Sequence, residues 1–139
     1  MIALKENSMI PYEGMEPFIY VSYSHRDSEK VHQIIDGMCN QGYRVWWDDG
    51  ILAGASWTEN IAGHLSRCAV FMCCISHSSI ESRYVSSDLL LAQKENKSIL
   101  PIFLEDVRLE DVRLNYRFHF FCRGFNTSDL TITITLTIL

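Results

Sequence analysis

Four short runs of apolar residues divide this chain, and each is followed by a polar turn. The runs occupy residues 18–23, 43–47, 69–76 and 98–104, and β-branched and aromatic side chains are frequent in them. Runs of this length and composition, bounded by turn-forming residues, are typical of buried strands. The pattern therefore predicts four strands.

Helical patterns fill the gaps between these strands. After the first strand, apolar residues recur at i, i+3, i+4 and i+7 and form one stripe, which consists of Val31, Ile34, Ile35 and Met38. After the second strand, Ser56 and Glu59 have the spacing of a capping box that begins a helix. The serine-rich stretch 76–94 follows the third strand, and its apolar residues recur at helical spacing. We predict a helix in each place.

Strand and helix alternate, which favours an α/β fold. The predicted architecture is a flavodoxin-like, doubly wound parallel sheet of order 2-1-3-4-5 with helices on both faces. The C-terminal end is atypical, because residues 114–139 do not show the pattern of a fifth strand and a terminal helix. Residues 131–139 (TITITLTIL) alternate strictly and predict a possible last strand. We divide the chain into a leader (1–16), an α/β domain (17–113) and a divergent C-terminal segment (114–139).

Charge and cysteine content narrow the choice of partners. The chain of 139 residues has a net charge of −5 and no basic stripe that would hold a nucleic acid. None of its apolar runs reaches the roughly 20 residues that a membrane helix needs. Its five cysteines lie mostly in apolar stretches, and we see no secretory signal. We therefore expect reduced thiols, a cytoplasmic protein and, without a C-x-x-C pair, no metal site.

The predicted topology indicates where a ligand would bind. In a sheet of this order the first and third strands are neighbours at a switch point, and ligands bind beyond their carboxyl ends. This arrangement gathers Ser24, Asp48, Trp57 and Asp88 around one cleft. Neither G-x-x-x-x-G-K-[ST] nor G-x-G-x-x-G occurs, which disfavours P-loop enzymes and dinucleotide-fingerprint enzymes. A receiver domain and a thiol phosphatase are disfavoured as well, because the required aspartate and arginine are absent from their positions.

Several spaced motifs, in unbroken order over residues 17–107, resemble one known family. They are PFIYVSYSHRDSEKV, GYRVWWDDGILAGASW, RCAVFMCCIS, HSSIESRYVSSDLLLA and SILPIFLEDV. Together they resemble the TIR (Toll/interleukin-1 receptor) domain in the form common among bacterial signalling and defence proteins. Some TIR domains cleave NAD⁺ at the bond between nicotinamide and ribose, and others act only as assembly modules.

The resemblance implies roles for individual residues. The family's catalytic glutamate follows an aromatic residue by four positions, and here Tyr84 is that aromatic and Asp88 takes the glutamate's place, one methylene shorter. By the same resemblance, Asp48 would contact the ribose and Trp57 would face nicotinamide, while Ser24 and Tyr84 would help to bind the substrate. The family's loop often has a proline before its glycine, and Ala53 stands in that position here.

Two functions remain open at this point. The first is a self-associating TIR protein of signalling or antiviral defence that cleaves NAD⁺, with Asp88 as the catalytic carboxylate and activity weakened by the shorter acid. NAD⁺ would be its substrate rather than a cofactor, and other TIR domains would be its partners. The second is a catalytically silent adaptor that acts through TIR–TIR contacts. Each of these residues also has an interpretation that does not involve a ligand. Asp88 would then be a solvated residue on a helix, Trp57 would pack the first turn of its helix against the core, and Ser24 would cap a helix.

Overall fold

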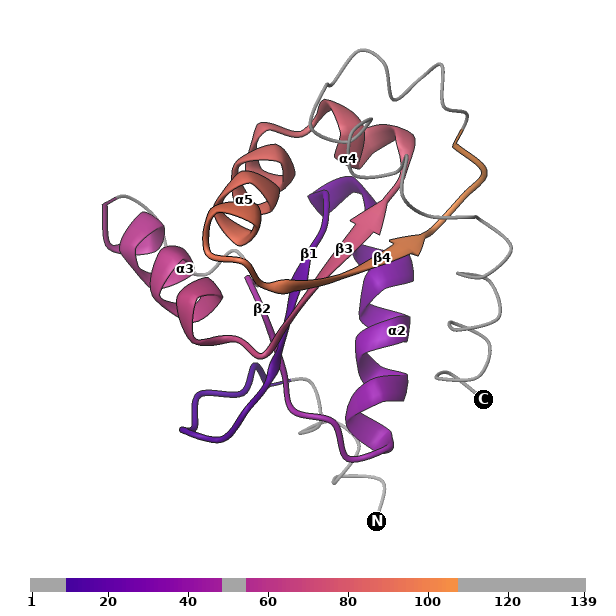
Figure 1. The fold of residues 1–139 in the computed structure, drawn as a ribbon. Coiled ribbons are helices and arrows are strands. Elements are labelled where there is room, and N and C mark those ends of the chain that lie inside the picture. The colour runs from indigo at the N-terminus through magenta and orange to yellow at the C-terminus, as the bar shows by residue number, and fades with distance from the viewer. Residues whose placement is uncertain (1–9, 49–54, 108–139) are drawn as a thin grey trace.

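The computed structural model describes residues 10–48 and 55–107, and within these ranges strands and helices alternate as predicted (Figure 1). The elements are β1 (Ile19–Ser22), the 3-10 helix η1 (His25–Asp27), α2 (Ser28–Asn40), β2 (Val45–Trp47), α3 (Ala55–Arg67), β3 (Val70–Ile75), α4 (His77–Glu81), α5 (Arg83–Lys94) and β4 (Ser98–Phe103). The first turn of α3 is described by its backbone alone.

The four strands form one parallel sheet in the order β2-β1-β3-β4. Val21 of β1 pairs with Trp47 of β2 on one side and with Met72 of β3 on the other. This confirms the predicted α/β fold and the first four positions of the predicted order 2-1-3-4-5. The possible last strand, residues 131–139, and the remainder of segment 114–139 lie outside the described residues.

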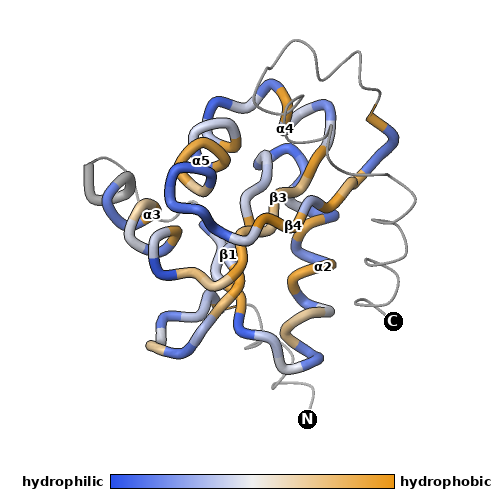
Figure 2. The backbone as a smooth tube through the Cα atoms, viewed as in Figure 1, coloured by the Kyte–Doolittle hydropathy of each residue, from blue (hydrophilic) through white to orange (hydrophobic). Residues whose placement is uncertain are grey.

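Helices cover both faces of the sheet, as predicted. α2 lies on one face, and α3, α4 and α5 lie on the other (Figure 1). Because successive side chains of a strand point to opposite faces, Tyr20 belongs to the core under α3 and α5, whereas Val21 belongs to the core under α2. In Figure 2 hydrophobic residues, in orange, recur along the strands and at helical intervals along α2. The site described below lies on the Tyr20 face.

The stretch 76–94, predicted as a polar, serine-rich turn and a helix, forms two helices, α4 and α5. Ser82 has an extended backbone (φ −76°, ψ 124°) and is both the last residue of the α4 turn and the N-cap of α5. Its hydroxyl accepts a hydrogen bond from the backbone N–H of Val85 at 3.3 Å. A serine that caps in this way gives the backbone an alternative to continuing the helix. The break turns α5 so that it runs back across the sheet face.

Residues 10–16, part of the predicted leader, lie along the edge strand β2. The backbone N–H of Tyr12 donates to the carbonyl oxygen of Val45 at 2.9 Å. Next to it, the Glu13 carboxylate accepts from Trp46 Nε1 at 3.0 Å and pairs with His64 Nε2 at 2.7 Å. These contacts join the segment to β2 and α3. No helix in the described ranges is long and apolar enough to span a membrane.

Candidate functional site

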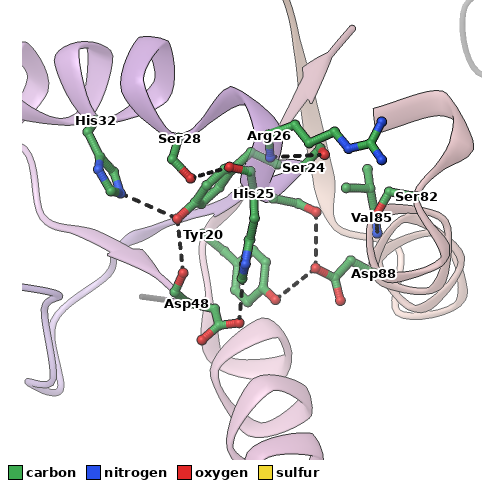
Figure 3. Close-up of polar contacts among 12 residues, drawn as sticks. Tyr20, Ser24, His25, Arg26, Ser28, His32, Asp48, Ser82, Val85 and Asp88 are labelled. Atoms are coloured by element: carbon green, nitrogen blue, oxygen red, sulfur yellow. Dashed lines mark hydrogen bonds and ion pairs between the residues drawn. The ribbon is translucent and has the colours of Figure 1, made fainter. Parts of the chain in front are cut away.

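The carboxylate of Asp88 lies against the first strand. Tyr20 and Ser22 are two residues apart on β1, so their side chains share the face that α5 covers. The Tyr20 hydroxyl and the Ser22 hydroxyl both donate to Asp88 Oδ2, each at 3.0 Å (Figure 3). Asp88 Oδ1 has no hydrogen-bond partner among the described residues. One oxygen is therefore held in place, and the other is left for a ligand.

Burial sets the protonation behaviour of this acid. It raises the pKa of Asp88 to about 6, the hydrogen bonds from Tyr20 and Ser22 lower it in part, and the nearby charge of Asp48 raises it further. Burial also raises the pKa of Tyr20 well above its ordinary value, with the charge of Asp88 acting in the same direction. Tyr20 therefore stays protonated and remains a donor at neutral pH, where Asp88 is mainly ionised.

A small pocket opens beside this carboxylate. It is lined by Asp88, Tyr20 and Ser22 together with Asp48, His25 and Tyr84, among others. Its volume is about 30 Å³, close to the volume of one water molecule in the liquid. The Tyr84 side chain at its wall is 63% exposed. The pocket is polar and narrow, and its most exposed aromatic wall is Tyr84.

Asp48 reaches the same pocket from the end of β2. Its main-chain oxygen accepts a hydrogen bond from the Tyr23 hydroxyl at 3.0 Å, and its Oδ2 lies 3.8 Å from His25 Nε2. These contacts hold the end of β2 beside the end of β1 (Figure 3). Two carboxylates, Asp48 and Asp88, therefore share one pocket, and their mutual repulsion favours a positively charged ligand between them.

A larger hollow adjoins this pocket. It has a volume of about 460 Å³ and is lined by residues of the β1–α2 connection and of the α4–α5 turn, including Ser24, Arg26, Ser82 and Arg83. Tyr23, His25 and Tyr84 line both spaces. Ser24 accepts a hydrogen bond from the Arg26 N–H at 3.4 Å, as the cap of η1. Ser24 therefore lies in the larger hollow rather than at the acid.

Asp27 is the N-cap residue of α2, yet its side chain makes no capping hydrogen bond. It instead accepts a short hydrogen bond from the Ser76 hydroxyl at the end of β3. The same Ser76 oxygen accepts the N–H of Ser79 at 3.0 Å in the capping box of α4. The connections that follow β1 and β3 are therefore linked directly.

The structure brings together part of the predicted site. Asp88, Asp48 and Tyr84 line one pocket, and Ser24 lines the hollow beside it. Trp57 lies in the first turn of α3, and its side chain is outside the description. Among the residues described, no three His, Cys, Asp or Glu side chains gather in a way that would hold a metal ion.

Sequence reasoning missed Tyr20 and Ser22, the two residues that hold Asp88. A signal was present in the sequence. Ser22 is a polar residue within a buried apolar strand, and it shares a face with Tyr20, two positions earlier. A buried hydroxyl needs a partner, and the stretch 76–94, which supplies the predicted helix, contains two carboxylates, Glu81 and Asp88.

Comparison with known proteins agrees with this architecture. A family model described as the TIR domain matches residues 19–132. No curated protein matches the chain.

Among solved structures, the chain is similar to the TIR domains in the structure of the activated Roq1 resistosome directly recognizing the pathogen effector XopQ. The TM-score is 0.58 and the identity 16%, over 88% of this chain and 80% of that one. At this identity the likeness shows a shared fold. Because the family match extends from the first strand to beyond the last described one, this chain belongs to the TIR domain family.

Proposed function

We propose that this TIR domain protein cleaves NAD⁺ at the nicotinamide–ribose bond, with Asp88 as the catalytic carboxylate. The observation that carries the proposal is the geometry of this acid. It lies half-buried at the carboxyl end of the central strands, where doubly wound sheets bind ligands. Its Oδ2 is fixed by two hydroxyls, and its Oδ1 has no partner among the described residues.

A carboxylate in this position suits the reaction. Nicotinamide leaves NAD⁺ as a neutral molecule, so the bond breaks without a proton donor and positive charge develops on the ribose. A fixed anion close to the ribose stabilises that oxocarbenium character, as carboxylates do in glycosidases. Water then forms the new bond to the ribose and releases one proton. Tyr20 and Ser22 keep the carboxylate oriented throughout because they bind the oxygen that does not face the sugar.

The neighbouring residues have supporting roles in this proposal. Asp48 lies at the end of β2 on the same pocket and is placed to accept hydrogen bonds from ribose hydroxyls. The pocket of about 30 Å³ is too small for a nicotinamide riboside, since ligand pockets usually exceed about 300 Å³. Substrate entry therefore requires the exposed Tyr84 side chain to turn outward. For Trp57, in the first turn of α3, we propose the role that the family resemblance implies, which is contact with nicotinamide.

The setting we propose is cytoplasmic signalling or defence through self-association. Membership in the TIR family supports a signalling or defence role, and the similar structure is described as TIR domains of an activated resistosome. A second candidate function is a silent TIR–TIR adaptor. The observations that favour it are the aspartate in place of glutamate and the narrowness of the pocket at Asp88. A displacement of about 1 Å at a reacting group can reduce a rate on the order of 10²-fold.

Nicotinamide release from NAD⁺ tests the proposal, measured at protein concentrations high enough for self-association. We expect slow release by the wild type, loss of release in Asp88→Ala, and faster release in Asp88→Glu. Asp106→Asn removes a carboxylate from an exposed position outside the pocket, and it serves as the matched control with unchanged release. Absence of release in both the wild type and Asp88→Glu would exclude the enzyme and leave the adaptor.

A further inference from the structure

The hollow of about 460 Å³ beside the acid pocket has a distinct chemistry. Two arginines line it from separate elements, Arg26 from η1 and Arg83 from the first position of α5. Figure 3 shows the Arg26 side chain extending from η1 toward the turn that carries Ser82. Two arginines from separate elements therefore line one hollow, together with Ser24, Ser78 and Ser82.

Neither guanidinium is used by the fold. Arg26 bonds to Ser24 through its backbone N–H, and neither arginine side chain has an ion pair or hydrogen bond with another described residue. Glu81 is the one carboxylate that lines the hollow. Two arginines therefore face one carboxylate across the hollow. Guanidinium groups that are not paired internally are suited to phosphate oxygens, which they bind in a bidentate way.

The two adjoining spaces differ in charge. The small pocket carries the carboxylates Asp48 and Asp88, and the larger hollow carries the two arginines, with Tyr23, His25 and Tyr84 as common walls. A dinucleotide such as NAD⁺ has the same polarity, because positive charge lies on the nicotinamide end and negative charge on the diphosphate. A ligand with its ribosyl bond at Asp88 would extend its diphosphate past Tyr84 into the larger hollow.

We infer that Arg26 and Arg83 form a phosphate-binding subsite, which holds the diphosphate of the dinucleotide while its ribosyl bond lies at Asp88. The identity of the ligand rests on the proposed function, whereas the affinity for phosphate groups rests on the hollow alone. Arg83 precedes Tyr84 directly, so phosphate binding at Arg83 would also fix the aromatic wall of the acid pocket. The subsite would thereby couple substrate binding to the opening of the pocket.

Binding of ADP-ribose, measured by titration calorimetry, tests this inference without any need for catalysis. Arg26→Gln and Arg83→Gln should each weaken binding about tenfold, because each removes charge-assisted hydrogen bonds to phosphate. Arg83→Lys keeps the charge but loses the bidentate fork, so its affinity should fall between the wild type and Arg83→Gln. Lys94→Gln removes the same charge from the opposite end of α5 and should bind like the wild type. Adenosine, which lacks phosphates, measures the part of binding that does not depend on the arginines.

The outcomes separate the subsite from the reaction. If ADP-ribose fails to bind, or if both glutamine variants bind it as tightly as the Lys94→Gln control, the subsite is wrong. This conclusion holds even when the wild type cleaves NAD⁺. Arginine-dependent binding of ADP-ribose by a protein that releases no nicotinamide supports the subsite and rejects the proposed reaction. Thermal melting of each variant shows that weaker binding is not unfolding, and both arginine side chains are exposed and unpaired in the fold.

Discussion

Two carboxylates in this domain, Glu13 and Asp88, are held in contrasting ways. Glu13 uses both oxygens, one for the Trp46 indole and one for the His64 imidazole. His64 Nδ1 also faces a carbonyl oxygen, that of Asn60, at 2.6 Å. Asp88 uses one oxygen, and its two partners are neutral hydroxyls.

The difference appears in the acidity of the two groups. Burial raises the pKa of Glu13, but the hydrogen bonds from His64 and Trp46 outweigh that effect and the pKa is lowered. Burial dominates at Asp88 and raises its pKa to about 6. A carboxylate whose oxygens are all engaged stabilises the fold, whereas one that is buried and half engaged stores unfavourable energy that a cationic ligand can relieve. The first arrangement is structural, and the second is suited to chemistry.

The largest effect should come from removing the charge of Asp88. Because its pKa is raised to about 6 from 3.8, the folded protein binds this proton more tightly than the unfolded chain does. Wild-type stability therefore falls as the pH rises from about 4 through about 6, by up to about 3 kcal/mol. Asp88→Asn cannot ionise and keeps an acceptor for the two hydroxyls. In urea denaturation it should be more stable than the wild type by about 1–3 kcal/mol at pH 8.

That gain should disappear near pH 4, where the wild-type carboxyl is protonated as well. Asp106→Asn, at an exposed position, should show no such difference at either pH. Equal stability of the wild type and Asp88→Asn at pH 8 would contradict the contrast with Glu13, because the buried acid would then carry no cost.

A smaller effect is expected from the hydroxyls that hold Asp88. Tyr20→Phe and Ser22→Ala each remove a hydrogen bond that lowers the pKa of Asp88, so that pKa should rise above about 6. The acidic limb of the pH–rate profile for nicotinamide release should move to higher pH, and the rate at pH 7 should fall about tenfold through lost orientation. A profile that keeps its acidic limb would show that these hydroxyls do not hold the active carboxylate.

The smallest effect belongs to the structural carboxylate. Glu13→Gln replaces one acceptor oxygen by an amide, so either His64 or Trp46 loses its partner. We expect a loss of about 1 kcal/mol in the free energy of unfolding at pH 7. Because the pKa of Glu13 is lowered in the folded protein, its contribution is present above the unfolded pKa and is lost as the pH falls through the folded one. Nicotinamide release should be unchanged, and a large loss of activity would mean that the two sites are coupled.

The sheet was predictable because its buried strands consist of short runs of apolar residues, many of them β-branched or aromatic, which are typical of strands. Each apolar run of the described chain became a strand, and the order β2-β1-β3-β4 follows from the connection rules of α/β folds. The helix after β3 was less predictable. Ser82 is compatible with a helix or with a cap, and only the bond of its hydroxyl to the Val85 N–H ends α4 and begins α5.

The location of the candidate site in the fold could be predicted from the sequence, but the contacts between its side chains could not. Topology and resemblance grouped Asp48, Tyr84 and Asp88, and these three residues line one pocket. They assigned Ser24 to the same cleft, although the cap of η1 turns it into the adjoining hollow. The partners of Asp88 are Tyr20 and Ser22 on the strand itself, because the acid in the second turn of α5 reaches the sheet face rather than the loop beyond it.

The bond between Asp27 and Ser76 limits how this domain can adjust to a ligand. It joins the segment after β1 to the segment after β3, and the capping box of α4 extends that joint into the helix. Neighbouring parallel strands fixed to each other at their exits cannot spread apart to admit a large molecule. A large ligand must instead be admitted by rotation of side chains such as Tyr84 or by tilting of α5 about the Ser82 break. The ends of β1 and β3 then move together and keep their relative position.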